Sequence, residues 1–371
     1  MRKKKLLFLI PTLGGGGAER VLVNLVNGLD KSKYDLTVQT LFKAGINASY
    51  LNGDIKLIEG KIKQFSGNIL LMKMFRPSTL FKYFIKEKYD VLISYLEGAC
   101  ARILSGCNDD SIKKLSWIHV VHKNEANTYY SFRSKNEAVN CYESFDKMIY
   151  VSQDVMSDFM SYYPTLKRNQ VVYNTNDDDK IKKMAAEPLG NITLSDDMNI
   201  VSVGRLIPMK GFDRLIDAHH RLKQDGIKNH LYILGTGELK EELEKQIKRN
   251  GDMDTVHLLG FCKNPYKIVS RCDVFACSSH REGFSTAVTE ALILGVPVVT
   301  TCVSGAYEQM GRNNEYGIVT ESNTDGLYTG LKKLLQEDGC LEHYRKQAKI
   351  RGSLFSKQHS VSSVENIIDS L

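Results

Sequence analysis

The stretch Val274-Phe-Ala-Cys277-Ser-Ser-His-Arg-Glu282-Gly-Phe284-Ser-Thr-Ala-Val-Thr-Glu290-Ala291 decides the fold of this chain. A short apolar strand over 274–276 stops at a loop of small residues, and the chain re-enters as a helix at about Phe284. The free N–H groups of a first helical turn point beyond the strand's end, where they can bind an anion. The stretch therefore predicts a strand–loop–helix unit with an anion site at the helix start.

Two carboxylates flank this helix start. Glu282 lies in the loop and Glu290 lies two turns into the helix, with seven residues between them. A carboxylate repels an anion, so we interpret both as partners of neutral hydroxyl groups on the same ligand. Phosphate-binding amides with hydroxyl partners on either side describe a nucleotide-sugar. Taken alone, the two glutamates are better interpreted as a helix cap and a solvated helix residue. The rest of the chain favours the interpretation that they bind a ligand.

A pair of cations follows the apolar strand over 199–203. The loop Gly204-Arg205-Leu-Ile-Pro-Met-Lys210-Gly211 presents Arg205 and Lys210 at the end of that strand. Two permanent cations in such a place can hold a diphosphate and neutralise the charge that builds on it as a sugar leaves. Either residue alone would be interpreted as an ordinary charge on the surface.

Strands and helices alternate along the whole chain. The apolar run Leu6–Ile10 ends at Pro11, and four glycines over 14–17 precede a helix. Further strands are predicted over 36–41, 91–95, 114–119, 147–152, 199–203, 231–234, 256–259, 274–276 and 298–301. This alternation predicts an α/β fold with parallel, doubly wound sheets, whose ligands bind at the carboxyl ends of the strands.

Length and composition narrow the class of protein. A chain of 371 residues suits two domains, and no apolar run reaches the roughly 20 residues that span a bilayer. The basic, apolar start is interpreted as a first strand and not a signal peptide, because Pro11 and the glycines follow it. The eight cysteines contain no Cys-x-x-Cys pair. We therefore expect no zinc site or disulfide framework, and a cytoplasmic location.

The net charge of +7 lies in the first half of the chain. Residues 1–180 hold 26 Lys and Arg against 19 Asp and Glu, while residues 181–371 hold 24 of each. No nucleic-acid-binding signature accompanies this charge, so we expect no nucleic-acid partner. An anionic membrane surface or a lipid-diphosphate acceptor explains a one-sided basic domain. The segment 68–88 carries Lys and Arg among Leu, Met and Phe, which fits either a membrane-surface helix or a helix packed on the sheet.

The quoted motifs carry a family resemblance. Glu282 to Glu290, followed by Ala-Leu-Ile-Leu-Gly-Val-Pro-Val-Val-Thr-Thr, resembles the Glu-x7-Glu signature of the retaining glycosyltransferases of family 4. The 204–211 loop resembles that family's Gly-Arg-Leu-x-x-x-Lys-Gly pattern. The resemblance implies the GT-B fold, with two Rossmann-like domains facing each other across a cleft. It assigns 1–178 to an acceptor-side domain, 190–354 to a nucleotide-sugar-binding domain, and 355–371 to a terminal helix that packs back on the first domain.

The resemblance also implies roles for single residues. Glu282 and His119 are the candidate catalytic residues that position the sugar, with His122 as the alternative to His119, and Glu290 holds the ribose. The diphosphate is held by Arg205, Lys210 and amides at the helix start, and the glycine loop permits its close approach. The loop from Gly260 to Tyr266 flanks the base. The donor-binding set is Gly16, Gly17, Arg205, Lys210, Gly260, Phe261, Gly283, Phe284, Ser285 and Glu290.

A metal-dependent alternative rests on Asp177-Asp178-Asp179, which could be the Asp-x-Asp of the other glycosyltransferase fold. We reject it because the triplet precedes a polar stretch to about Asp197 that reads as a structureless linker, and because the cations do a metal's work. We expect no metal and no cofactor.

The function predicted is transfer of a sugar from a nucleotide-sugar, expected to be UDP-linked, with retention of configuration. The expected acceptor is a glycan or lipid-diphosphate-linked oligosaccharide of capsule, lipopolysaccharide or other cell-surface polysaccharide assembly, with peripheral contact at the inner membrane face. The alternatives are a sugar-nucleotide epimerase of the same fold and a catalytically silent partner subunit.

Overall fold

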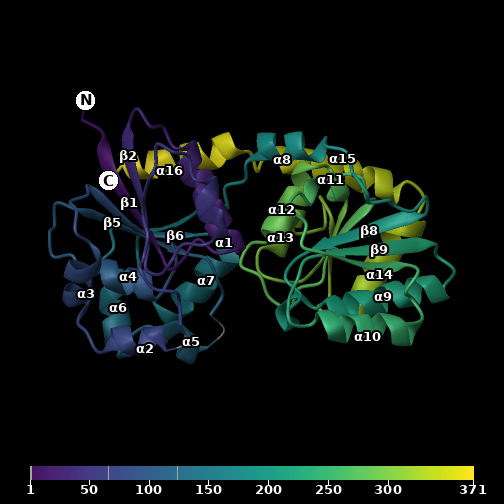
Figure 1. Cartoon of the computed structure of the whole chain (residues 1–371), viewed down its shortest axis with the longest axis horizontal. Helices are drawn as coiled ribbons and strands as arrows, with labels where there is room; N and C mark the ends of the chain where they lie inside the picture. Colours follow the sequence, from purple (N-terminus) through teal and green to yellow (C-terminus); the bar gives the residue numbers. More distant parts are fainter. Residues whose placement is uncertain (1, 66, 123) are drawn as a thin grey trace. The chain divides into compact units, whose positions relative to one another are not determined.

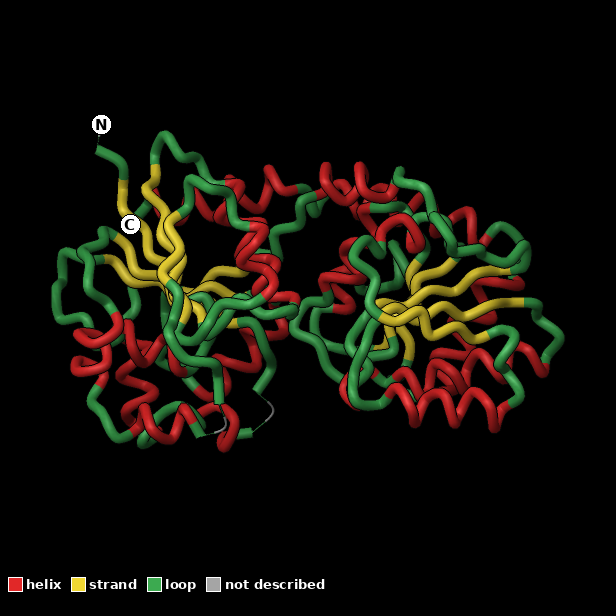
Figure 2. Tube along the Cα trace, viewed as in Figure 1, coloured by secondary structure: helices red, strands yellow, loops and turns green. Residues whose placement is uncertain are grey.

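The computed structural model describes residues 2–65, 67–122 and 124–371. Its contacts divide the chain into two compact units, Met1–Thr175 with Lys357–Leu371 and Asn176–Ser356. The sequence had placed the corresponding boundaries at 178, 190 and 355. Each unit is a parallel sheet covered by helices (Figure 1, Figure 2). The predicted α/β architecture of two Rossmann-like domains is confirmed.

Unit 1 is built on a parallel sheet of seven strands within its described residues, in the order β3-β2-β1-β4-β5-β6-β7. The strands are β1 Lys4–Ile10, β2 Tyr34–Thr40, β3 Lys56–Ile58, β4 Val91–Ser94, β5 Lys113–Ile118, β6 Lys147–Tyr150 and β7 Asn169–Val171. Strand β1 lies inside the sheet between β2 and β4, and Leu6 to Ile10 are fully buried. A strand covered on both faces reads as a continuous apolar run, which is why its sequence predicted it so clearly.

The helices of unit 1 cover both faces of its sheet. They are α1 Gly17–Gly28, η1 Ile46–Tyr50, α2 Asn68–Lys73, α3 Pro77–Phe84, α4 Ala99–Leu104, α5 Glu125–Tyr129, α6 Lys135–Glu143, α7 Gln153–Tyr162 and α16 Lys357–Asp369. Helices α1 and α16 pack together, while α4 packs against α3 and α6.

The last helix completes the first unit. In Figure 1 the yellow α16 lies beside the purple α1. Tyr34 Oη donates a hydrogen bond to Asp369 Oδ1 at 2.7 Å, and the Asp30 amide donates to Glu365 Oε1 at 2.8 Å. A side chain at Gly28 would collide with Val361, so this glycine allows the two helices to approach closely.

Unit 2 is built on a parallel sheet of six strands in the part of the chain described, in the order β10-β9-β8-β11-β12-β13. The strands are β8 Met198–Val203, β9 Asn229–Leu234, β10 Val256–Gly260, β11 Val274–Cys277, β12 Val298–Thr301 and β13 Ile318–Thr320. The order reverses between β8 and β11, because β9 and β10 lie on one side of β8 and the later strands on the other. Such a reversal opens a crevice at the carboxyl ends of the two central strands.

The helices of unit 2 form a layer on each face of this sheet (Figure 1). They are α8 Asp178–Ala185, η2 Pro208–Lys210, α9 Phe212–Gln224, α10 Lys240–Asn250, α11 Tyr266–Val269, α12 Thr286–Ile293, α13 Ala306–Met310, α14 Thr324–Gln336 and α15 Cys340–Ser353. Helix α9 packs against α10 and α14, whereas α12 packs against α8 and α15.

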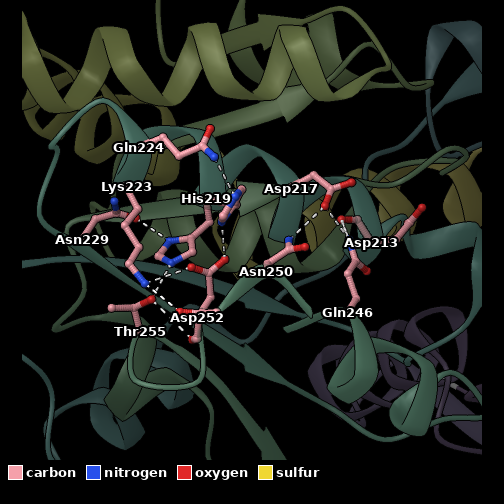
Figure 3. A network of polar contacts seen from close by, with 12 residues as sticks. Asp213, Asp217, His219, Lys223, Gln224, Asn229, Gln246, Asn250, Asp252 and Thr255 are labelled. Carbon is pink, nitrogen blue, oxygen red and sulfur yellow. Dashed lines mark hydrogen bonds and ion pairs between the residues drawn. The ribbon is translucent and has the colours of Figure 1, made fainter. Parts of the chain in front are cut away.

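A polar network ties α9 to the strands and loops beside it (Figure 3). The buried His219 ring lies 2.6 Å from Asn229 Oδ1 and 3.0 Å from Thr255 Oγ1. Because Asn229 Nδ2 donates to Ile227 O, its Oδ1 faces the ring, and His219 Nδ1 carries the proton. Burial lowers the pKa of His219 to about 4, so the ring is neutral near pH 7.

Two local predictions were wrong. The stretch after Asp177 is not structureless, because α8 occupies Asp178–Ala185 and packs on α11 and α12. Asp177 is the N-cap of α8, with its side chain accepting from the Lys180 amide. The helix after Glu282 begins at Thr286 and not at Phe284, because Phe284 turns into the core and is 5% exposed.

Candidate functional site

A polar pocket lies in unit 2 at the carboxyl ends of β8 and β11. Its lining includes residues of both strands, of the loops that follow them and of the start of α12, namely Ser202, Val203, Lys210, Phe212, Phe275, Cys277, Ser278, Ser279, Glu282, Ser285 and Ala287. This is the place where the order of the sheet reverses, and an open α/β sheet binds its ligands there.

Lys210 and Glu282 meet in this pocket as an ion pair. Lys210 Nζ lies 2.6 Å from Glu282 Oε1, and the two side chains are 21% and 14% exposed. Ser279 Oγ donates to the same carboxylate oxygen at 2.7 Å. The structure thus brings together two residues that are 72 positions apart in the chain.

The loops after β8 and β11 are fixed to each other through their backbones. The His280 amide donates to Met209 O at 2.8 Å, and Ser278 Oγ donates to Lys210 O at 2.9 Å. The buried Arg214 guanidinium donates through Nε to Ser278 O at 2.8 Å. Lys210 and Glu282 therefore sit on two loops that are held in one fixed relation.

Two glycines make the turn after β8 possible. Gly211 has a φ of +59°, and a Cβ there would lie 2.4 Å from Ser278 O. Gly235 has a φ of +149°, and a Cβ there would lie 1.8 Å from Gly204 O. Arg205 follows Gly204 directly and is exposed. The loop therefore presents the Arg205 side chain at the end of β8 beside the turn that follows β9.

The start of α12 is fixed by hydrogen bonds from side chains of α12, of α13 and of the loop before α13. Ser285, the N-cap residue, is 5% exposed, and its carbonyl accepts from Gln309 Nε2 at 2.8 Å and from Thr289 Oγ1 at 3.1 Å. Ser304 Oγ donates to Gly283 O at 3.1 Å. Ala287 in the first turn lines the pocket, so the amino end of α12 faces it.

Glu290 is held by a residue for which the sequence had assigned no role. Tyr266 Oη donates to Glu290 Oε1 at 2.8 Å, and Tyr266 is buried at the start of α11. The same loop contains Gly260, with a φ of +71°, and Phe261, whose side chain is 68% exposed. An exposed aromatic ring of this kind can stack on a planar base.

Unit 1 holds the other predicted residues. Gly16 is the N-cap of α1 and Gly17 its first residue, at the carboxyl end of β1. His119 follows β5 and is 7% exposed, with its amide donating to Glu97 Oε2 at 2.9 Å. His122 is also buried, and its amide donates to Asp158 Oδ2 at 2.7 Å.

His119 differs from an ordinary core histidine. Its Nε2 atom is buried and makes no hydrogen bond with the described residues, and its ring packs on Tyr95 at 4.9 Å between centroids. Burial lowers the pKa of His119 to about 3, which leaves a neutral ring near pH 7. A buried polar atom without a partner is uncommon in native proteins, which makes this nitrogen a candidate contact for a ligand.

The predicted residues thus fall into two sets. Lys210, Glu282 and Ser285 line one pocket, and Arg205 and Glu290 lie on the loop and helix that border it. Gly16, Gly17 and His119 lie at the carboxyl ends of strands in unit 1. Sequence reasoning missed Ser279 and Tyr266, although Ser279 was within the quoted stretch and Tyr266 ended a loop assigned to the base.

Three observations concern metal binding and insertion into a membrane. Within the described residues, no group of three or more His, Cys, Asp or Glu side chains is arranged to hold a metal ion. The Asp triplet is used locally, since Asp177 caps α8 and Asp178 pairs with Lys182 at 3.0 Å. None of the described helices combines the length and the apolar character needed to cross a membrane.

Comparisons with known proteins give the family. Residues 15–180 match the family model of Glycosyltransferase Family 4, and residues 191–351 match that of glycosyl transferases group 1. The chain is 30% identical over 375 residues to a Campylobacter jejuni N-acetylgalactosamine-N,N'-diacetylbacillosaminyl-diphospho-undecaprenol 4-alpha-N-acetylgalactosaminyltransferase, covering 95% of this chain and 96% of that protein. The chain therefore belongs to glycosyltransferase family 4 and is a glycosyltransferase.

Two further proteins are similar along their whole length. One is a second Campylobacter jejuni enzyme, the GalNAc-alpha-(1->4)-GalNAc-alpha-(1->3)-diNAcBac-PP-undecaprenol alpha-1,4-N-acetyl-D-galactosaminyltransferase, which is 26% identical over 96% of this chain and 95% of its own. The other is the crystal structure of Anabaena HepE in complex with UDP, which superposes with a TM-score of 0.80 at 20% identity, covering 99% and 100% of the two chains. The structural likeness confirms the GT-B fold.

Proposed function

We propose that this glycosyltransferase moves a sugar from a UDP-linked donor to a hydroxyl of a lipid-diphosphate-linked glycan, with retention of anomeric configuration. The observation that carries the proposal is the Lys210 and Glu282 pair in a pocket at the start of α12. A cation and a helix amino end suit a diphosphate, and a carboxylate suits sugar hydroxyls.

The relatives support this choice of substrates. The 30% identical relative is named for transfer of N-acetylgalactosamine to a diphospho-undecaprenol-linked sugar, and the structural neighbour HepE was crystallised with UDP. We extend both properties to this chain, with an N-acetylhexosamine or hexose as the transferred sugar. The pathway would be the assembly of a cell-surface polysaccharide such as capsule or lipopolysaccharide, on the cytoplasmic side of the membrane.

The roles of the donor-binding residues follow from their chemistry. Lys210 and Arg205 hold the diphosphate together with the amides at the start of α12, and they neutralise the charge that develops as the sugar departs. Glu290, oriented by Tyr266, accepts hydrogen bonds from the ribose hydroxyls. Phe261 stacks on the base from an exposed position.

The reacting sugar needs partners that do not compete with the leaving group. Glu282 accepts hydrogen bonds from its hydroxyls, and His119 offers a neutral ring nitrogen for another. A phosphate oxygen of the leaving diphosphate takes the acceptor proton on the same face of the sugar, so no side chain acts as base. Because the two cations supply the positive charge, we expect full activity in the presence of a chelator.

The test is a transfer assay with purified enzyme. UDP-N-acetylgalactosamine, UDP-N-acetylglucosamine, UDP-galactose and UDP-glucose are offered with a polyprenyl-diphosphate-linked oligosaccharide, and the linkage formed is read by NMR. A preceding thermal-shift screen identifies the donor, because a ligand of the native state raises its melting temperature. Glu282→Ala and Lys210→Ala should each abolish transfer. Transfer at the wild-type rate in either variant, or inversion of the anomeric centre, would refute the proposal.

A further inference from the structure

The short helix α2 and the turn that follows it expose apolar side chains to solvent and bury a polar one. Among the residues of α2, Asn68 is the buried one, while Leu70 and Leu71 are 58% and 51% exposed. Met74 and Phe75 continue the exposure at 76% and 46%. We call Leu70, Leu71, Met74 and Phe75 the α2 surface. Four large apolar side chains are thus exposed within six consecutive residues, a concentration that is typical of an interaction site.

The α2 surface is held in place by a buried cation. Arg102 of α4 is 1% exposed, and its guanidinium donates to Met72 O at 3.0 Å and to Phe75 O at 2.8 Å. The same guanidinium makes a bidentate pair with Glu137 of α6, at 3.1 Å for each bond. Two carbonyl groups at the end of α2 are therefore fixed from inside the domain, and the side chains beside them are directed outward.

Glu137, the partner of Arg102, carries a negative charge. Burial tends to raise the pKa of Glu137, but hydrogen bonds from Arg102 and Arg133 outweigh it and lower the pKa to about 2. Glu137 is thus ionised at any physiological pH, and Arg102 is matched in charge. A buried guanidinium is a costly means of holding a surface turn, which points to a use for the turn's exposed side chains.

The charges around the α2 surface define its partner. Residues 61–88 contain seven Lys and Arg and one acidic residue, Glu87, which pairs with Lys56. Lys73 and Arg76 lie within the α2 turn itself, and Lys82 and Lys86 are exposed on and just beyond α3, which starts one residue after Arg76. Lys73 Nζ also lies 5.4 Å from the ring centre of Tyr130, which is half exposed.

We infer that the α2 surface and these four cations dock unit 1 on an anionic phospholipid bilayer. Apolar side chains flanked by Lys and Arg suit the boundary between acyl chains and anionic headgroups, where both contributions favour binding. A protein partner would need a dense acidic face to match the same cations. The inference extends the proposed function, since a lipid-linked acceptor lies in a membrane, but vesicle binding requires no sugar transfer and is tested separately.

The experiment is sedimentation of the full chain with vesicles of phosphatidylethanolamine and phosphatidylglycerol, compared with phosphatidylcholine alone. The wild type should bind the anionic vesicles and be released by high salt. The double variant Leu71→Glu/Met74→Glu should bind at least tenfold more weakly. Lys82→Ala/Lys86→Ala should lose roughly 25-fold in affinity for the anionic vesicles, at about fivefold for each charge removed. Its affinity for the neutral vesicles should not change.

The chain offers a matched control for the apolar positions. Met253 and Ile350 of unit 2 are 65% and 55% exposed, which is similar to the exposure of Met74 and Leu71. Met253→Glu/Ile350→Glu should therefore bind the vesicles as the wild type does. All variants should keep the wild-type thermal shift with UDP, which shows that they fold and separates docking from donor binding. Equal loss in both glutamate variants, or no preference of the wild type for anionic vesicles, would overturn the inference. So would a wild-type dimer in sedimentation equilibrium that Leu71→Glu/Met74→Glu dissociates.

Discussion

The ion pair between Lys210 and Glu282 leads to a prediction about the affinity for UDP. The Lys210 ammonium lies 2.6 Å from the Glu282 carboxylate, and both side chains are largely buried. A diphosphate that binds Lys210 therefore competes with this carboxylate for the ammonium. Glu282→Gln removes the competing charge and keeps the shape, so we expect the variant to bind UDP more tightly while transferring sugar more slowly.

The magnitude follows from the pair's geometry. A hydrogen bond between charged groups contributes roughly 1.5–3 kcal/mol, and Ser279 supports the same oxygen of Glu282. If about half of that is recovered when Gln replaces Glu, the gain is roughly 0.8–1.5 kcal/mol, which corresponds to about four- to twelvefold in the dissociation constant. Lys210→Met should act in the opposite direction, weakening UDP binding by about tenfold or more.

Isothermal titration with UDP at fixed ionic strength measures these affinities, and single-turnover transfer measures the rate. Glu244→Gln is the control, because Glu244 is in the same unit and forms an exposed pair with Lys240 at 3.6 Å. We expect no change in its affinity. If Glu282→Gln binds UDP no better than the wild type, the ion pair does not compete with the ligand and the reasoning fails.

Three further predictions concern other parts of the structure. Tyr266→Phe leaves Glu290 without its 2.8 Å donor, so KM for the nucleotide-sugar should rise about fivefold with kcat nearly unchanged; a wild-type KM in steady-state kinetics would contradict this. Arg102→Ala leaves Glu137 paired with Arg133 alone and removes the donor of Met72 O and Phe75 O, so urea denaturation should show a loss of roughly 2–4 kcal/mol, and a loss below about 1 kcal/mol would refute the supporting role. The pKa of His219 is about 4 in the native state and about 6.5 in the unfolded state, so the unfolded state binds an extra proton as the pH falls. The free energy of unfolding should therefore drop by about 2 kcal/mol between pH 7 and pH 5. His219→Gln should lack this part of the pH dependence in urea denaturation, and a variant with the same pH dependence as the wild type would contradict the prediction.

The strands were predictable because of where they lie. Strands such as β1 and β11 are buried on both faces, so their sequences are short apolar runs ending at Pro or at small residues. The helix α8 was missed because its sequence is polar and short, and its one clear signal, Asp177 followed by Lys180 at the N3 position, was interpreted as part of a linker. Helix α12 started later than expected because Phe284 is used in packing.

The candidate site was predictable to the extent that it depends on local motifs. The quoted stretch and the 204–211 loop each end a strand, and the order of a doubly wound sheet brings those ends together. The Tyr266 contact with Glu290 depends on how α11 packs beside α12, and sequence spacing carries no such information. The α2 segment left two interpretations open because composition alone cannot say whether Leu71 and Met74 point inward or outward.

Helix α16 has a consequence for the order in which the chain matures. Its buried side chains Val361, Val364, Ile367 and Ile368 belong to unit 1, although every residue of unit 2 is synthesised before them. During translation, unit 2 can fold as soon as it emerges, while α1 must wait with an uncovered apolar flank until α16 leaves the ribosome. A chain that is released early would therefore display that flank to chaperones and proteases, whereas a finished chain conceals it.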